Sequence, residues 1–273
     1  MEFDNGQYFV FVKDITLPSN KIIKVYELVK DLQDDHVLNL WAKSLRNYYI
    51  EENLIDDLYT GTGLSKSEYL QKNIFPNPAN KLGAATMSGE FGEILVYDFI
   101  HYTQNYYVTK LRYLEKTNPD VPVSGSDVIG YAIKNVLKPS IEDKLLIAEV
   151  KTRSSVGRRL TIQDNPLTKA IADSPKDRNR IAESLNAEKR RLLMRNRLTE
   201  AKIVERFQNR TDNPYQIEFS AVAVLSKEIY TEEFIREVID SINIDDIISN
   251  ILIIYSDKLL AFIRDLYRRA CTC

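Results

Sequence analysis

Apolar and polar residues follow two different rhythms along this chain, and the rhythm changes from segment to segment. Apolar residues at every second position, or in short continuous runs bounded by turn residues, are typical of strands. Apolar residues three or four positions apart indicate helices instead. Segments of both kinds follow one another along most of the sequence. This alternation predicts an α/β or α+β fold in which helices flank a mixed central sheet.

The expected elements can be given by residue number. Strands are expected at 7–17, 21–32, 107–115, around 127, at 144–150, 215–226 and 248–256, and helices at 34–59, 88–107, 183–208, 231–242 and 258–269. The segment 183–208 is expected to be a long basic helical region because it has good helix formers and contains no Pro or Gly.

The sequence changes its character near residue 80. A polar stretch with Gly and Pro, 60–80, separates an opening strand–helix pattern from a more regular alternation of helices and strands. Two parts are therefore expected: an N-terminal extension over 1–80 and a main domain over 81–273. Packing of the extension on the core of the main domain is one possible arrangement.

Composition narrows the class of protein. Hydrophobic residues make up 44% and charged residues 28% of 273 residues, as in soluble globular proteins. No apolar run approaches the roughly 18 residues of a membrane helix, and the acidic, polar start does not resemble a secretion signal. Two cysteines at the C-terminal end and two histidines exclude a disulfide framework and a Cys/His zinc site. The expected location is the cytoplasm, without membrane contact.

Polar residues interrupt the apolar strand at 144–150 near its end. Glu149 and Lys151 lie two positions apart, so in a strand they share one face while Val150 points to the other. Acid-x-Lys also occurs at 142–144 and 200–202, where a turn and a helix account for it. For 149–151 alone, an ion pair at a solvent-exposed strand end, worth about 0.5 kcal/mol, is the simpler interpretation.

A second carboxylate changes that interpretation. Asp127 follows Gly125 and Ser126 and begins another apolar run. If the two runs pair as an antiparallel hairpin, Asp127 and Glu149 come together, and adjacent carboxylates repel unless a cation neutralises them. Mg²⁺ binds one or two carboxylates, a backbone carbonyl such as that of Val150, and waters. With the ammonium of Lys151 to stabilise charge at phosphorus, the set suits metal-assisted phosphodiester hydrolysis.

An upstream helix carries two further acids. Glu93 follows Gly92 and heads an apolar run, which favours a position facing the site. Glu90 lies one turn earlier and is explained equally well as a first-turn acid stabilised by the helix dipole. The sequence favours Glu93 but leaves the choice between the two open.

This order of residues resembles a known superfamily. A helix Glu, an Asp before one strand and Glu-x-Lys at the end of the next resemble the PD-(D/E)xK, or restriction-endonuclease-like, nucleases. The pattern "GEFGEILVYDF … GSDVIG … LLIAEVKTR" more closely resembles the HamA family, the nuclease subunit of Hachiman anti-phage defence systems. The resemblance covers 85–155 well and the remainder by element order. It implies metal ligands at Asp127 and Glu149, a catalytic lysine at 151 and the helix carboxylate at 93. The first acid follows Ser, not Pro.

The resemblance also implies an activity and partners. It implies a Mg²⁺-dependent endonuclease cutting DNA, with Mn²⁺ as a substitute metal, in a restriction-endonuclease-like domain over 81–273. It implies a superfamily 2 helicase subunit as partner. The alternative is a catalytically inactive nuclease-fold module that binds DNA or regulates the helicase.

The charge is unevenly distributed, although the net charge is only −2. Residues 151–210 hold 16 Lys and Arg against 7 Asp and Glu, whereas the remainder is acidic. A basic segment directly after the candidate strand suggests phosphate contacts beside the metal. Arg153, Arg158 and Arg159 are the expected contacts, while a solvated basic helix face explains the rest of the segment equally well.

Overall fold

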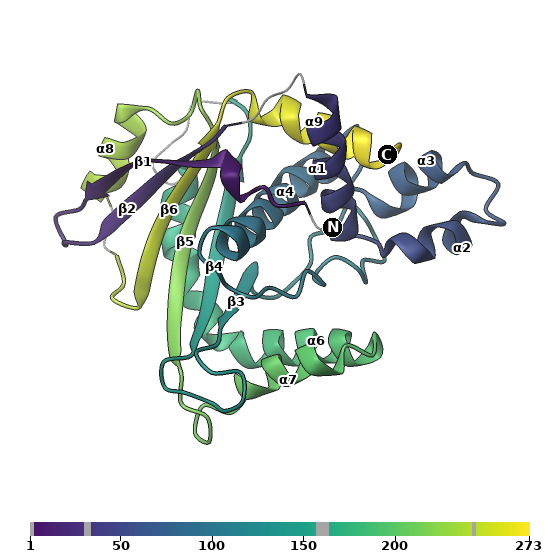
Figure 1. Cartoon of the computed structure of the whole chain (residues 1–273). Coiled ribbons are helices and arrows are strands. Elements are labelled where there is room, and N and C mark those ends of the chain that lie inside the picture. The colour runs from purple at the N-terminus through teal and green to yellow at the C-terminus, as the bar shows by residue number, and fades with distance from the viewer. Residues whose placement is uncertain (1–2, 30–33, 157–163, 242–243) are drawn as a thin grey trace.

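Six strands form one mixed sheet, as the alternation of the sequence predicts (Figure 1). The structure, a computed structural model, describes residues 3–29, 34–156, 164–241 and 244–273. Four neighbouring strands run parallel, and each edge strand runs antiparallel to its neighbour. In spatial order the strands are β1 (Phe9–Thr16), β2 (Ile22–Leu28), β6 (Ile248–Ser256), β5 (Gln216–Ser226), β4 (Lys144–Arg153) and β3 (Val128–Ala132). The predicted α/β class is confirmed.

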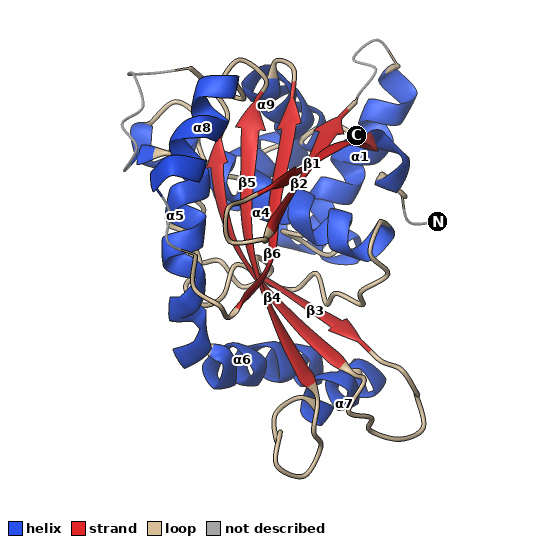
Figure 2. Cartoon of the chain, turned by 90° about the vertical axis from the view of Figure 1, so that its left-hand side faces the viewer, coloured by secondary structure: helices blue, strands red, loops and turns tan. Residues whose placement is uncertain are grey.

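Helices cover both faces of this sheet (Figure 2). The longer ones are α1 (Asp35–Asn47), α4 (Lys81–Tyr102), α5 (Pro166–Asp173), α6 (Ile181–Met194), α7 (Leu198–Arg206), α8 (Glu232–Ser241) and α9 (Leu259–Ala270). Shorter turns are η1 (Gly6–Tyr8), η2 (Glu52–Leu54), α2 (Ile55–Tyr59), α3 (Lys66–Tyr69), η3 (Leu70–Ile74) and η5 (Ser174–Asn179). In the described ranges no helix has the length and apolar character needed to cross a membrane.

Alternate residues of the central strands build two separate layers of core. Ala148 and Val150 of β4 pack with α1, α4 and α9 on one face. Ile147, the residue before Ala148, packs on the opposite face with α6 and α7. The neighbouring strand β5 is buried on both faces, as a parallel central strand requires, which explains its nearly continuous apolar sequence.

The N-terminal residues belong to the same sheet and the same core. Strand β2 pairs in parallel with β6, so that Val25 lies beside Ile253. Helix α1 packs on α9, with the rings of Trp41 and Phe262 5.1 Å apart. The division expected near residue 80 coincides with the start of α4, and within the described ranges neither sheet nor core is interrupted there. The division stays a prediction.

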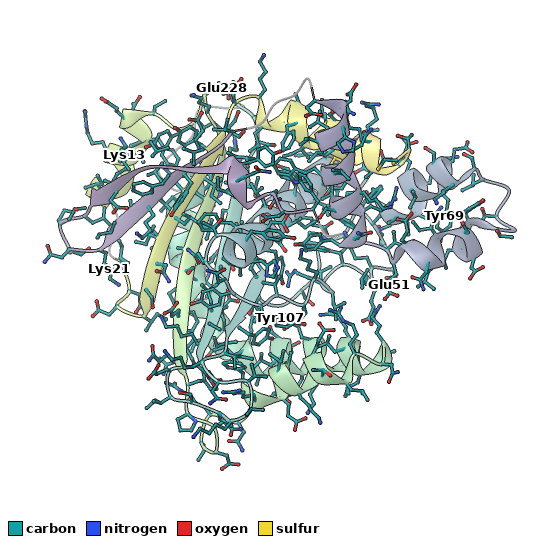
Figure 3. The ribbon with its side chains drawn as sticks, viewed as in Figure 1. Lys13, Lys21, Glu51, Tyr69, Tyr107 and Glu228 are labelled. Carbon is teal, nitrogen blue, oxygen red and sulfur yellow. The ribbon has the colours of Figure 1, made fainter. Side chains whose placement is uncertain are left out.

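The strand expected at 107–115 is wrong. Tyr107 alone pairs, through an isolated bridge with Tyr131, and turns follow it. Lys110 has a φ of 55°, in the left-handed region that a strand does not allow. Tyr107, labelled in Figure 3, lies between the sheet and the α6–α7 pair, where its hydroxyl donates to Glu200. The turn that follows carries Arg112 toward Asp127.

The basic helical region expected at 183–208 is two helices packed side by side, α6 and α7, not one (Figure 1). Asn196, between them, has a φ of 56°. The amides of Asn196 and Arg197 donate back to the carbonyls of Leu193 and Leu192, at 3.0 and 2.9 Å, and close the helix end. Asparagine tolerates the left-handed region better than most residues, so it ends a helix without glycine.

Helix α4 lies very close to β4 at one glycine, which gives a first prediction. A Cβ on Gly92 would lie 1.8 Å from Oγ1 and 3.1 Å from Cβ of Thr152. Gly92→Ala is therefore expected to lower the free energy of unfolding by about 1–3 kcal/mol through overpacking. Gly89, one turn earlier, has open space around its Cβ position. Gly89→Ala should raise that free energy by about 0.5–1 kcal/mol, and equal effects in urea denaturation would contradict the close packing.

Candidate active site

Asp127 and Glu149 are neighbours because β3 and β4 pair as an antiparallel hairpin, as the sequence predicts. Val128 lies opposite Ala148, so the residue before one faces the residue after the other. Oδ2 of Asp127 accepts a hydrogen bond of 3.0 Å from the amide of Val150. The carboxylate thus takes the place of a strand carbonyl at the end of the ladder, and its position is fixed by the backbone of β4.

Glu149 and Lys151 lie on the face of β4 opposite to that of Ala148 and Val150, and they form an ion pair. The ammonium also lies 3.1 Å from Oδ2 of Asp173, at the end of α5. Burial, and after it the charge of Asp127, raises the pKa of Glu149 to about 7. Burial lowers the pKa of Lys151, but its bonds with Glu149 and Asp173 outweigh this and raise the pKa above its ordinary value. The lysine is therefore held in its charged form.

Glu93 reaches the same site through an arginine. Its Oε2 accepts a hydrogen bond of 2.6 Å from the hydroxyl of Tyr113 and lies 3.0 Å from Nε of Arg112. The guanidinium of Arg112 then reaches Asp127, with Nη2 3.4 Å from Oδ1. Burial, and next the charge of Asp127, raises the pKa of Glu93 to about 8. Two acidic side chains thus share one buried cation, and the raised pKa keeps Glu93 largely protonated near neutral pH.

Glu90 lies one turn away and has different partners. It accepts a hydrogen bond of 2.9 Å from Tyr49 and pairs with Lys116. Tyr49 in turn contacts Tyr267 of α9, so Glu90 connects α4 with the C-terminal helix. Of the two acids that the sequence leaves open, Glu93 is the one that shares Arg112 with Asp127.

Three site residues escaped the reading of the sequence. Arg112 and Tyr113 lie in the segment wrongly expected to be a strand, and Asp173 lies in the basic segment. None belongs to a local motif with Glu149. Tertiary packing alone brings them together, and no signal in the chain marks them in advance.

A model of the HamA family matches residues 6–270, almost the whole chain. The chain belongs to the HamA family. Membership makes it a component of a Hachiman anti-phage defence system. No curated protein and no solved structure gives a significant match.

The basic residues of this HamA-family chain differ in their partners. Arg153 ends β4, and its Nε donates 3.2 Å to the carbonyl of Ser155. Arg158 and Arg159, the other expected phosphate contacts, lie outside the described residues. Farther along, many cations pair within the fold: Lys189 with Glu205, Arg195 with Glu51 and Glu115, Arg197 with Glu200, and Arg206 with Asp143.

The pairs of Arg195 and Arg206 connect the α6–α7 hairpin to the remainder of the fold, whereas those of Lys189 and Arg197 lie within it. Glu51, labelled in Figure 3, lies beside the N-terminal helices, and its Oε1 is 2.9 Å from Nε of Arg195. These cations of the hairpin are therefore paired with acids of the same chain. Arg153, which directly follows the site strand, keeps its predicted role in phosphate binding as a prediction.

The donor groups suit a hard divalent cation. Asp127, Glu149 and the carbonyl of Val150 are the oxygen donors that Mg²⁺ and Mn²⁺ prefer. The two carboxylates are close enough for one to raise the pKa of the other. Among the residues that the structure describes, no three His, Cys, Asp or Glu side chains already converge as a metal centre.

Proposed function

We propose that this HamA-family chain is a metal-dependent DNA nuclease with a PD-(D/E)xK-type site. The observation that carries the proposal is the placement of Asp127 beside Glu149 and Lys151. The β3–β4 pairing and the bond from the Val150 amide fix this placement. Two carboxylates and a charged lysine in this order are the groups that metal-assisted phosphodiester hydrolysis requires.

Asp127, Glu149 and the Val150 carbonyl would hold Mg²⁺, with Mn²⁺ as a substitute. A cation bound there polarises the phosphoryl oxygens and activates a water for attack. The metal also explains why two acids lie together in a largely buried place, since a positive charge favours the ionised form of both.

The side chains of the chain itself have separate tasks. Lys151 presents a fixed positive charge, aligned by Glu149 and Asp173, for the negative charge that develops on phosphorus in the transition state. Arg112 holds Asp127 from the other side and connects it to Glu93. Glu93 is thus a positioning residue, because it acts on Asp127 through the guanidinium.

Arg153, with Arg158 and Arg159, would bind the phosphates of DNA beside the site. Such contacts position a backbone and carry no base sequence. The Hachiman system would supply a superfamily 2 helicase subunit as partner of this chain, as the resemblance in sequence implies. A catalytically inactive module that binds DNA or regulates the helicase is the competing proposal.

The decisive test is cleavage of plasmid and single-stranded DNA by the purified chain with Mg²⁺, Mn²⁺ or EDTA. We expect cutting with either metal and none in EDTA. A double variant, Glu149→Gln with Lys151→Met, controls for contaminating nucleases and should not cut. An RNA substrate in the same assay decides which nucleic acid is the substrate. Cleavage by the double variant would contradict the assignment of Glu149 and Lys151 to the active site. If the wild type is inactive alone, the same assay is run with its helicase partner, and inactivity there favours the inactive module.

A further inference from the structure

Tyr113 lies in the segment between α4 and β3 and is 1% exposed. Its hydroxyl donates a hydrogen bond of 2.6 Å to Oε2 of Glu93. Nε of Arg112, the residue before it, lies 3.0 Å from the same oxygen. Two neighbouring side chains of one turn thus converge on a single carboxyl oxygen. A buried hydroxyl needs a hydrogen-bond partner, and Glu93 supplies it.

Aromatic packing fixes the ring of Tyr113. It stacks on Tyr49, with the ring centroids 5.2 Å apart and 20° between the ring planes. Tyr49 is fixed in turn, because its hydroxyl donates to Glu90 at 2.9 Å and lies 2.5 Å from the hydroxyl of Tyr267. These three tyrosines are at most 4% exposed. Closely packed rings have little room to turn, so the hydroxyl of Tyr113 is held in one direction, toward Glu93.

A second acid of α4 anchors the segment that carries Tyr113. Lys116 pairs with Glu90, and the two side chains are 4% and 3% exposed. The same ammonium donates a hydrogen bond of 2.8 Å to the carbonyl of Pro119. The amide of Lys116 donates at 3.2 Å to the carbonyl of Tyr113, so the anchor and the tyrosine belong to one turn. Glu90 and Glu93 therefore have complementary tasks: the first holds the segment, and the second receives its side chains.

Arg112 carries the effect of these contacts to Asp127. Its Nη2 lies 3.4 Å from Oδ1 of Asp127, while the amide of Val150 donates to Oδ2 at 3.0 Å. The direction of Oδ1 therefore depends on the plane of the guanidinium, which Glu93 holds from the Nε side. Without the hydroxyl of Tyr113 the carboxyl group of Glu93 can rotate, and the guanidinium loses its support on that side.

We propose that Tyr113 is a positioning residue of the candidate active site, acting on Asp127 through Glu93 and Arg112. The inference rests on the proposed nuclease function and adds a residue that the acid-x-Lys pattern does not contain. Tyr113 is not a catalytic residue, because its hydroxyl is bonded to Glu93. Partners that orient metal ligands from behind commonly change metal affinity or activity by about 10–100-fold when they are removed.

The test uses Tyr113→Phe, which removes the hydroxyl and keeps the stacked ring. In DNA cleavage with saturating Mg²⁺, kcat should fall by about 10-fold or more, while KM for DNA stays nearly unchanged. Tyr48→Phe is the matched control. Tyr48 is also 1% exposed, and its hydroxyl donates 2.6 Å to another acid of α4, Asp98. Tyr48→Phe should lower the melting temperature as Tyr113→Phe does, and should leave kcat unchanged.

A double-variant comparison shows whether Tyr113 acts through Glu93. Glu93→Met removes the carboxyl group and keeps much of the side-chain length. In the Glu93→Met background, Tyr113→Phe should cause no further loss of kcat, because the group that the hydroxyl positions is gone. Independent effects would multiply instead, so the same fold-loss in both backgrounds would refute the proposed route.

Failure of the inference differs from failure of the proposed function. If the wild type cuts DNA and Tyr113→Phe cuts equally fast, the hydroxyl is only structural and the inference is refuted, while the nuclease stands. If the wild type binds Mn²⁺ without cutting, calorimetry on the full chain replaces kcat. Tyr113→Phe should then weaken Mn²⁺ binding by about 10-fold and Tyr48→Phe should not, and equal affinities would refute the inference. If the wild type neither cuts DNA nor binds Mn²⁺, the proposed function fails and the inference with it.

Discussion

Lys151→Met is expected to reduce the rate of DNA cleavage by about 10²–10³-fold, the usual effect of removing one group that stabilises transition-state charge. Methionine keeps much of the length and volume of the side chain and removes the charge. The ammonium lies between Glu149 and Asp173, so its loss removes the positive charge held beside Glu149. Single-turnover cleavage with saturating Mg²⁺ measures the effect on the chemical step.

A control on the same strand separates this role from general damage to β4. Lys144→Met removes the lysine at the start of β4, which pairs with Glu218 at 2.7 Å, far along the strand from Glu149. It should leave the rate nearly unchanged. Lys151→Met should still bind Mn²⁺, because it keeps Asp127 and Glu149. Loss of cleavage together with loss of Mn²⁺ binding would mean that the lysine acts through the ligands and not on the phosphate.

Arg112→Met is expected to lower the free energy of unfolding by about 3–5 kcal/mol, the range observed when one partner of a buried ion pair is removed. The side chain of Arg112 is 9% exposed and binds both Glu93 and Asp127. It also donates to the carbonyls of Val123 and Ser126, so it fixes the loop that precedes β3. Removing it leaves two largely buried acids, Glu93 and Asp127, without their shared cation. Urea denaturation in EDTA at pH 7 and at pH 9 measures the loss.

The pH dependence identifies the cause of that loss. Glu93 already has a pKa of about 8 in the folded chain against an ordinary 4.5, and removal of Arg112 raises it further. An acid whose folded pKa is raised binds more protons when folded, so its destabilising effect grows as pH rises from its unfolded pKa to its folded pKa. Between pH 4.5 and about pH 8 Glu93 affects the wild type and the variant equally, and only above about pH 8 does the variant continue to lose stability after the wild type has stopped. The loss caused by Arg112→Met should therefore be larger at pH 9 than at pH 7.

A surface arginine provides the comparison. Arg197, whose side chain is 35% exposed, pairs with Glu200 one turn away on α7. Arg197→Met should cost no more than about 1 kcal/mol, as for surface ion pairs, at both pH 7 and pH 9. A loss in Arg112→Met that is equal at pH 7 and pH 9 would point to lost packing of the loop, and not to the two acids.

The sequence by itself determined the pieces that depend on near neighbours. Alternating and continuous apolar runs predicted the mixed sheet, because each position of a strand is apolar or polar according to whether its side chain faces the core or the solvent. The same period of two placed Glu149 and Lys151 on one face and Val150 on the other, and the structure has this arrangement. Asp127 could be proposed as their partner because a hairpin joins strands that follow one another in the chain.

Tertiary structure alone decided the groups that complete the site. Arg112 reaches Asp127 from a turn within 107–115, a segment whose apolar pattern is that of a strand. The pattern does not show that Lys110 has a left-handed backbone conformation, which ends the extended segment. Asp173 reaches Lys151 only because α5 packs beside β4, and residues so far apart share no spacing that a sequence could show. Local periodicity fixes which face a side chain takes. Which distant charges meet there depends on how the layers pack, and that is set by the whole core at once.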